Sequence, residues 1–169
     1  MDTLQETRWE LQETMRFLGA VAAGIEDAVG QTANSITYLA GKELGHRFSE
    51  HSRRTDDIEE ALAEVRRILK DNHCLWEFEG FKPSTRPTLV ETTPEGDSVM
   101  LVFRDCMIRQ SLFTFGHPQK GSVCTMMFGF FAGALEIIMG RQSTLDIVHA
   151  GENACYKKLT VKPAQAGAV

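Results

Sequence analysis

The chain has few cysteines, no excess of positive charge and no long apolar run, and each shortage excludes a class of protein. The four cysteines, at positions 74, 106, 124 and 155, form no CxxC pair. In a chain without an export signal this favours free thiols or metal ligands over disulfides. The net charge of −5 and the absence of a basic run argue against a nucleic-acid surface.

Targeting signals and catalytic motifs are also missing. The N-terminal MDTLQETRWE contains no secretory apolar segment, and no apolar run reaches the roughly 18–20 residues that span a bilayer. We therefore expect a cytoplasmic protein without a membrane span. There is no GxGxxG after a strand, no P-loop, no HExxH and no GxSxG. A binding protein is thus favoured over an enzyme.

The length and composition suit one globular domain. Of the 169 residues, 43% are hydrophobic, which is enough for a real core. We expect a single small-molecule-binding domain over residues 1–162, with a helical part (1–72) and a second part (73–162). The alanine- and glycine-rich end, 163–169, is expected to fray.

Apolar periodicity predicts three helices before any strand. Residues 2–29 carry a heptad-like apolar stripe, which fits either packing on the domain's own core or self-pairing in a dimer. A second helix is expected near 35–51, capped by Thr32 or Asn34. A third should begin at Ile58, after a cap within 55–57.

The rest of the chain predicts an antiparallel sheet interrupted by one buried helix. Alternation indicates a strand over 73–81, and residues 88–92 and 98–104 flank a turn sequence. A buried helix over 125–139 ends at Gly140, and a hairpin of strands 144–148 and 155–162 follows. The fold class is therefore α+β: N-terminal helices, an antiparallel β-meander, a buried glycine-rich helix and a C-terminal hairpin.

Two predicted helices carry glycine pairs at four-residue spacing. Small residues at this spacing let another backbone approach closely. We expect these helices to pack tightly, with each other as one option, although glycines without a special role would give the same pattern. The pairs are Gly41 with Gly45, and Gly129 with Gly133.

Potential metal ligands lie at the ends of the last elements. Cys124 opens the buried helix, while His149 and Cys155 are expected to face each other across the hairpin mouth. Asp146 requires a β-bulge to join them, and Cys106 is an alternative fourth ligand. The pattern fits a structural zinc site, or else core thiols and a turn histidine.

The apolar residues are rich in aromatic rings and methionine. Such side chains line cavities for flat apolar ligands, but they also fill ordinary cores, and the sequence leaves both readings open. The predicted ligand pocket consists of Trp76, Phe78, Phe103, Cys106, Phe113, Met127, Phe128 and Phe131.

The stretch CTMMFGFFAGALEIIMGR followed by LDIVHAGENAC resembles the 4-vinyl-reductase (hydrocarbon-binding) domain family, which shares its fold with the vesicle-tethering TRAPP subunits. The family pattern has a Cys, a Gly-x-x-x-Gly, a Glu-x-x-Cys and a last Cys. Cys124, Gly129, Gly133 and Cys155 match it. Asp146 stands where the family has Glu and His149 where it has Cys, and the span from 149 to 155 is about two residues short.

The resemblance implies a TRAPP-subunit-like fold, commonly dimeric, with a hydrophobic ligand cavity. In the family's phenol sensors the four matching positions bind zinc, which implies a zinc cofactor at Cys124, Asp146, His149 and Cys155. We therefore expect a non-catalytic homodimer that binds or senses a small hydrophobic or aromatic molecule. The alternatives are an accessory protein of tetrapyrrole or bacteriochlorophyll biosynthesis that handles a porphyrin-type substrate, and a purely structural dimerisation or tethering module.

Overall fold

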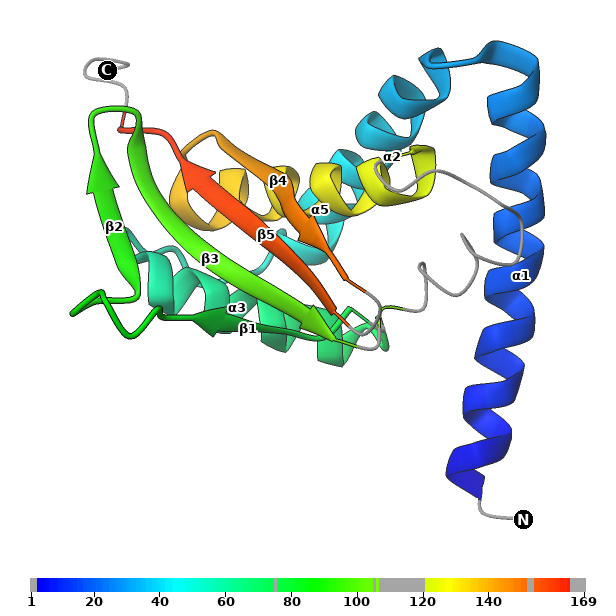
Figure 1. Ribbon diagram of the computed structural model, residues 1–169, viewed down its shortest axis with the longest axis horizontal. Coiled ribbons are helices and arrows are strands. Elements are labelled where there is room, and N and C mark those ends of the chain that lie inside the picture. The colour runs from blue at the N-terminus through cyan, green and yellow to red at the C-terminus, as the bar shows by residue number, and fades with distance from the viewer. Residues whose placement is uncertain (1–2, 75, 105, 107–120, 152–153, 165–169) are drawn as a thin grey trace.

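The computed structural model describes residues 3–74, 76–104, 106, 121–151 and 154–164, and in its first helix the side chains of residues 10, 13, 14 and those from 16 on. Helices pack on one face of an antiparallel sheet (Figure 1). The predicted α+β class is confirmed. In chain order the elements are α1 (Thr3–Val29), α2 (Thr32–Ser49), α3 (Ile58–Asp71), β1 (Phe78–Phe81), β2 (Val90–Thr93), β3 (Gly96–Arg104), α5 (Ser122–Met139), β4 (Ser143–Ala150) and β5 (Ala154–Val161).

The sheet is built around β3 and β5. Its strand order is β1-β3-β5-β4, and β2 pairs with the first half of β3 while β1 pairs with the second half. The two predicted hairpins, β2–β3 and β4–β5, are both present. Along β3 the residues Val99, Leu101 and Phe103 are fully buried, so this face of the sheet forms the floor of the core.

The core helix α5 crosses α2 at the two glycine pairs. A Cβ added to Gly41 would lie 2.0 Å from the carbonyl oxygen of Met126, and one added to Gly133 would lie 2.1 Å from that of Lys42. Gly45 and Gly129 are equally close to the facing backbone, at 2.3 and 2.0 Å. No side chain fits these four positions, so the two helix backbones are in direct contact.

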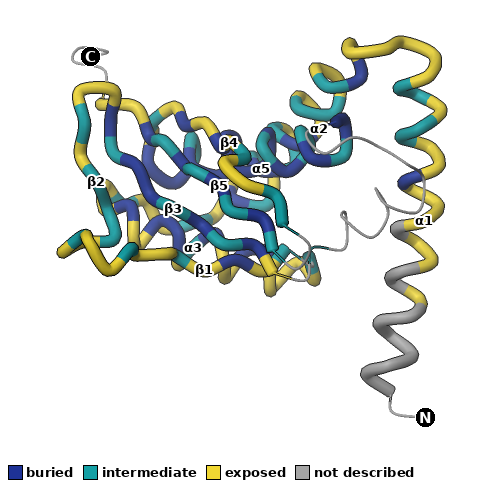
Figure 2. The backbone as a smooth tube through the Cα atoms, viewed as in Figure 1, coloured by how far each residue is buried: buried dark blue, intermediate teal, exposed yellow. Residues whose placement is uncertain are grey.

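The length and composition of α5 also satisfy the requirements for a membrane span. It has 18 residues and a mean hydropathy of 1.7. However, 67% of it is buried inside the structure, against α2, α3 and the sheet, as Figure 2 shows by its dark blue colour. A core helix of a soluble domain has the same composition, and its buried position accounts for the apolar sequence.

Helix α3 covers the same side of the sheet with one apolar face. Ile58, Leu62 and Val65 are buried there. Asp57 is the N-cap, because its carboxylate accepts hydrogen bonds from the backbone N–H groups of the second and third residues of the helix at 2.8 and 2.9 Å. The predicted start of this helix is therefore confirmed.

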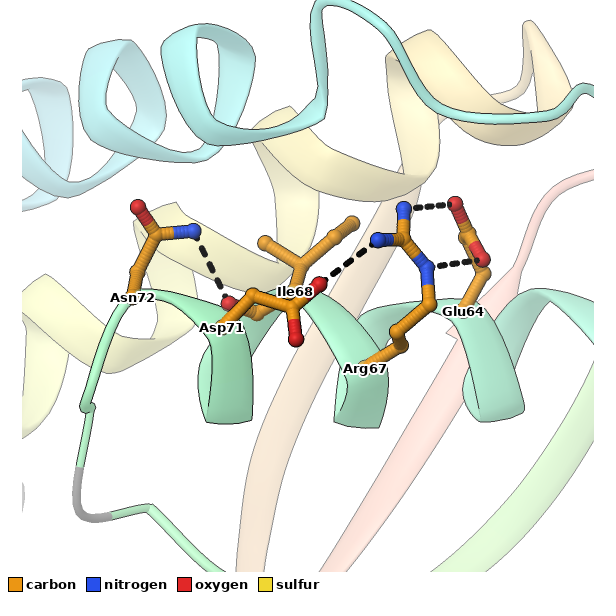
Figure 3. Close-up of polar contacts among 5 residues, drawn as sticks. All are labelled: Glu64, Arg67, Ile68, Asp71 and Asn72. Atoms are coloured by element: carbon orange, nitrogen blue, oxygen red, sulfur yellow. Dashed lines mark hydrogen bonds and ion pairs between the residues drawn. The ribbon is translucent and has the colours of Figure 1, made fainter.

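The outer face of α3 carries a network of polar contacts (Figure 3). Arg67 donates to both carboxylate oxygens of Glu64, at 2.6 and 2.9 Å, and to Asp71 at 2.7 Å. Asn72 closes the helix by donating to the carbonyl oxygen of Ile68 at 2.9 Å. Side-chain pairs of this kind stabilise a helix by about 0.2–0.5 kcal/mol each. The position of α3 on the sheet is therefore determined mainly by burial of its inner apolar face.

Two local predictions are wrong. The strand expected over 73–81 begins only at Phe78, because α3 ends in a Schellman motif: His73 adopts φ 53°, and the N–H of Cys74 donates to the carbonyl oxygen of Leu69 at 2.8 Å. The N-cap of α2 is Gln31, which makes no side-chain cap, so neither Thr32 nor Asn34 has that role.

Helix α1 projects away from the rest of the molecule (Figure 1). It contacts α2 and α5, and its carboxylate Glu26 accepts a hydrogen bond from the N–H of Ser122 at 2.8 Å and another from the Ser122 hydroxyl. Glu26 thus caps the N-terminus of α5 from a different helix. Among the described side chains of α1, the exposed large apolar residues are Phe17, Leu18, Val21 and Val29. The expectation that the apolar stripe of this helix packs on the domain's own core is therefore wrong at Leu18 and Val29, which are exposed.

Candidate ligand-binding site

The last strand, β5, carries a lysine into the core. Side chains alternate between the two faces of a strand, so the consecutive residues Lys157 and Lys158 must point in opposite directions. Because Leu159 and Val161 are fully buried, the inward residue is Lys157, which is 2% exposed. Its partner across β3 is Leu101, on the floor of the core.

Soft and aromatic groups surround the amine of Lys157. Its Nζ donates to the thioether sulfur of Met127 at 3.0 Å, and it lies 4.5 Å from the ring centroid of Phe103 and 5.1 Å from that of Phe128. Met127 and Phe128 belong to the second turn of α5, so the amine sits between that helix and the sheet. A thioether is a weak acceptor, and it leaves most of the hydrogen-bonding capacity of the amine unused.

This environment disfavours the charged form of the lysine. Burial lowers the pKa of Lys157, while the nearby thiols of Cys124, Cys106 and Cys155 oppose that shift. Aromatic faces attract a cation by only about 0.5–2 kcal/mol, which is small beside the cost of burying an unpaired charge. Among the described residues no carboxylate lies within ion-pair distance of Nζ. The site therefore offers one polar group, the Lys157 amine, among mostly apolar side chains.

The residues of the predicted ligand pocket fall into two groups. Phe78, Phe103 and Phe131 pack on one another, with ring centroids 5.2 to 5.7 Å apart, and fill the core. Trp76 packs edge-on against Phe130 at 5.5 Å. A second set surrounds the amine of Lys157: Met127, Phe128, Cys106 and the ring of Phe103. Phe113 lies outside the described residues.

The predicted zinc ligands lie on two faces of the sheet. Directly opposed residues in an antiparallel pair share a face. Cys155 pairs with Ala150, not with His149, and both Cys155 and Cys124 are buried. The anticipated bulge occurs between Ile147 and His149, and it does bring Asp146 and His149 to one side. Both of these side chains lie on the solvent-exposed face of the sheet.

These four residues therefore do not fit a single tetrahedral ion, whose ligand atoms must all lie about 2.0–2.3 Å from the metal. The expectation that residues 149 and 155 face each other is wrong, because the strand pairing is shifted by one residue. In the part of the chain that the structure describes, no group of three His, Cys, Asp or Glu residues is arranged to hold a metal.

Sequence reasoning missed Lys157, although the signal was present. A pair of consecutive lysines inside a strand must place one of them on the inner face. The pattern Cys155-x-Lys157-x-Leu159-x-Val161 assigns that lysine to the same face as two aliphatic side chains. Buried lysines are rare unless they are paired or functional, so the pattern itself was informative.

A hollow of about 290 Å³ lies between α2, α5 and the start of β4. One of its lining residues is Glu136, whose carboxylate contacts the Nζ of Lys42 at 2.8 Å and the Nε2 of His46 at 3.0 Å. Hydrogen bonds from these two residues lower the pKa of Glu136. The remaining lining is mostly polar: Tyr38, Ala132, Gln142, Ser143, Thr144 and Lys162. Such walls do not suit an apolar ligand.

The comparisons with known proteins support the fold. The chain is similar to the crystal structure of the phenol-responsive sensory domain of the transcription activator PoxR with phenol, with a TM-score of 0.65 over 88% of this chain and 74% of that one. The two chains share a fold. At 18% sequence identity the likeness shows the fold alone. No family model and no curated protein matches the chain, so membership of the 4-vinyl-reductase family stays a prediction.

Proposed function

We propose that this protein binds and senses a small aromatic molecule that carries one polar group, with Lys157 as the polar anchor. The observation that carries the proposal is a single buried amine among Met127, Phe103 and Phe128. Small-molecule sites are mostly apolar and contain a few polar groups that fix the ligand's orientation. The fold shared with a phenol-responsive sensory domain supports the same class of ligand.

A phenol illustrates how this site would work. Its hydroxyl oxygen accepts a hydrogen bond from the Lys157 amine, and its ring packs on the methionine and phenylalanine side chains of α5. A benzene-like ligand without the hydroxyl group leaves the amine unsatisfied and binds more weakly, because a buried polar group without a partner costs about 1–3 kcal/mol.

The signal would leave the site through α5 and α1. Met127 and Phe128 lie close to the N-terminus of α5, which Glu26 of α1 caps. The exposed apolar residues of α1 would pair with those of a second copy, so the proposed sensor is a homodimer whose α1 helices carry the output. A location in the cytoplasm remains part of this proposal.

Isothermal titration calorimetry with phenol tests the proposed function. We expect the wild-type protein and the Lys158→Met variant to bind phenol, since Lys158 lies on the other face of β5. The Lys157→Met variant, which keeps the length of the side chain and removes the amine, should lose at least most of the affinity. Equal binding by all three proteins would refute the role of Lys157, and no binding by any of them would refute the proposed ligand class.

A further inference from the structure

The hollow between α2, α5 and the start of β4 has no part in the proposed function. Its volume of about 290 Å³ is at the small end of the range of ligand-binding pockets, about 300–1,000 Å³. Its lining residues are different from those that surround the Lys157 amine, and most of them are polar. A ligand of this hollow must therefore be small and polar, unlike a phenol.

One wall of the hollow carries a buried hydroxyl group without a hydrogen-bond partner. Ser143 is the first residue of β4, is 6% exposed, and lies on the same face of the strand as the buried Leu145. Its Oγ makes no hydrogen bond to any described residue. Buried polar groups in folded proteins are usually paired, because an unpaired one is costly. This hydroxyl group is therefore suited to a ligand that occupies the hollow.

A second wall carries a lysine whose charge is not paired with a carboxylate in the described part of the chain. The Nζ of Lys162 donates to a neutral group, the side-chain oxygen of Gln142, at 3.3 Å. The backbone of this lysine is held at the wall, because its N–H donates to the carbonyl oxygen of Gln142 at 2.8 Å and its own carbonyl oxygen accepts from the Nε of Arg141 at 2.7 Å. Its ammonium group is thus positioned to attract an anion.

The other charged residues that line the hollow are paired with each other. Lys42 lies 2.8 Å from Oε2 of Glu136, and its carbonyl oxygen is fixed against α5 at Gly133. Glu136 therefore offsets one of the two lysines, which leaves the lining with a net charge of +1. A single negative charge matches this lining, whereas the carboxylate of Glu136 would repel the second charge of a phosphate dianion.

We propose that this hollow binds a small organic acid that carries one carboxylate and at least one hydroxyl group. The ligand carboxylate pairs with the ammonium group of Lys162 and accepts a hydrogen bond from Ser143, whose hydroxyl group turns towards it about χ1. The ligand hydroxyl group donates to the carboxylate of Glu136, both of whose protein contacts use Oε2. Such a ligand would connect α5 to the edge strand β4.

Titration of the full-length, ¹⁵N-labelled protein with sodium lactate, followed by nuclear magnetic resonance, tests the proposal. We expect saturable shifts of the backbone amide signals of Gln142, Ser143 and Thr144. Lactamide, in which a neutral amide replaces the carboxylate, and sodium chloride at the same ionic strength should not produce them. The absence of saturation with lactate would overturn the site, equal binding of lactamide would overturn the carboxylate, and the same shifts with chloride would reveal only a salt effect and overturn both.

Three variants test which residues bind the acid. Lys162→Met should weaken lactate binding about fivefold, the effect of a good exposed ion pair. Ser143→Ala should weaken it about threefold or more, because the ligand loses a hydrogen bond to its charged group. Both proteins should fold, since the Lys162 side chain is exposed and the Ser143 hydroxyl group has no described partner.

The matched control is Lys158→Met, which removes the same charge from the outer face of β5 and should bind lactate as the wild type does. Equal weakening in this control would reduce the effect of Lys162 to a general attraction of anions and overturn the proposal. Unchanged binding by Lys162→Met or by Ser143→Ala would overturn the assignment in the same way. Because the hollow shares no lining residue with the surroundings of Lys157, the outcome is independent of phenol binding.

Discussion

At the scale of single residues, Lys157 and Lys158 differ in their surroundings although they are neighbours in the sequence. The first is enclosed by sulfur and aromatic rings, and the second lies on the outer face, opposite Asp146 in the neighbouring strand. Substitutions at the two positions therefore form a matched pair, in which the chemistry of the change is the same and only the environment differs.

Replacing Lys157 should make the protein more stable. A methionine fills the same space without a polar group, so we expect Lys157→Met to raise the free energy of unfolding by about 1–3 kcal/mol, the usual cost of a poorly satisfied buried polar group. Lys158→Met should change it by less than about 0.5 kcal/mol. Urea denaturation measures both values. A destabilised Lys157→Met would mean that the amine makes a strong interaction in the core.

The same lysine gives a pH dependence with a defined sign. Its pKa in the folded protein is lowered below the ordinary value of 10.5, so in the interval between the two values the unfolded chain holds a proton that the folded chain does not. Stability then rises with pH across that interval. The stability of the wild-type protein should therefore approach that of Lys157→Met as the pH rises towards 10.5, whereas a constant difference would contradict the lowered pKa.

Metal analysis tests the zinc site that the resemblance implies. Because the predicted ligands occupy two faces of the sheet, we expect less than one zinc per chain, and no change in the melting temperature after treatment with EDTA. One zinc per chain, lost together with thermal stability in Cys124→Ala, would contradict this arrangement.

At the scale of elements, the contact between α2 and α5 determines the architecture of the core. Glycine is costly in a helix, by about 0.5–1 kcal/mol relative to alanine, so four glycines at one crossing require a compensating contact. The hydroxyl groups of Thr37 and Thr125, 2.7 Å apart, and the ion pair of Lys42 with Glu136 lie along the same crossing.

Two alanine substitutions in helices should have opposite effects. In Gly133→Ala the new methyl group meets a backbone carbonyl, which cannot rotate away, so we expect a loss of about 3 kcal/mol. In Gly24→Ala nothing lies within 4 Å of the new Cβ, and helix propensity predicts an unchanged or slightly higher stability. Thermal unfolding followed by circular dichroism measures both, and a stable Gly133→Ala protein would show that the helices can separate.

The sequence predicted most of these elements, because periodicity and turn residues are local signals. Three features lay beyond it. The Schellman motif at His73 uses a residue other than glycine, which hid the end of α3. The one-residue shift between β4 and β5 depends on the bulge near Val148, and it pairs Cys155 with Ala150 in place of His149. The cap that Glu26 provides to α5 joins residues 96 positions apart, and no local pattern indicates such a contact.

At the scale of the whole molecule, α1 is the helix that leaves apolar side chains exposed to solvent over much of its described length. Phe17 is 70% exposed and Leu18 50%, on a helix that leaves the body of the domain (Figure 1). On α2, Ile36 and Leu39 are also exposed. Apolar residues spaced three and four positions apart on one helix are typical of a helix that pairs with another.

A charge on this stripe should prevent the proposed dimer. We expect the wild-type protein to be dimeric in sedimentation velocity experiments at micromolar concentration, and Val21→Glu to shift it to the monomer, because an unpaired carboxylate is costly to bury. Arg16→Glu also adds negative charge, on an exposed part of α1 away from the stripe, and it should leave the dimer intact. A monomeric wild-type protein would contradict the proposal.

The contact of α2 and α5 at the four glycines affects how ligand binding near α5 would move the other helices. At the four glycines the backbones of α2 and α5 touch directly, so no side chain can be rearranged there to absorb a small shift. We therefore expect a shift of α5 to carry α2 with it and, through the Gly30 link and the Glu26 carboxylate, to move the exposed apolar stripe of α1.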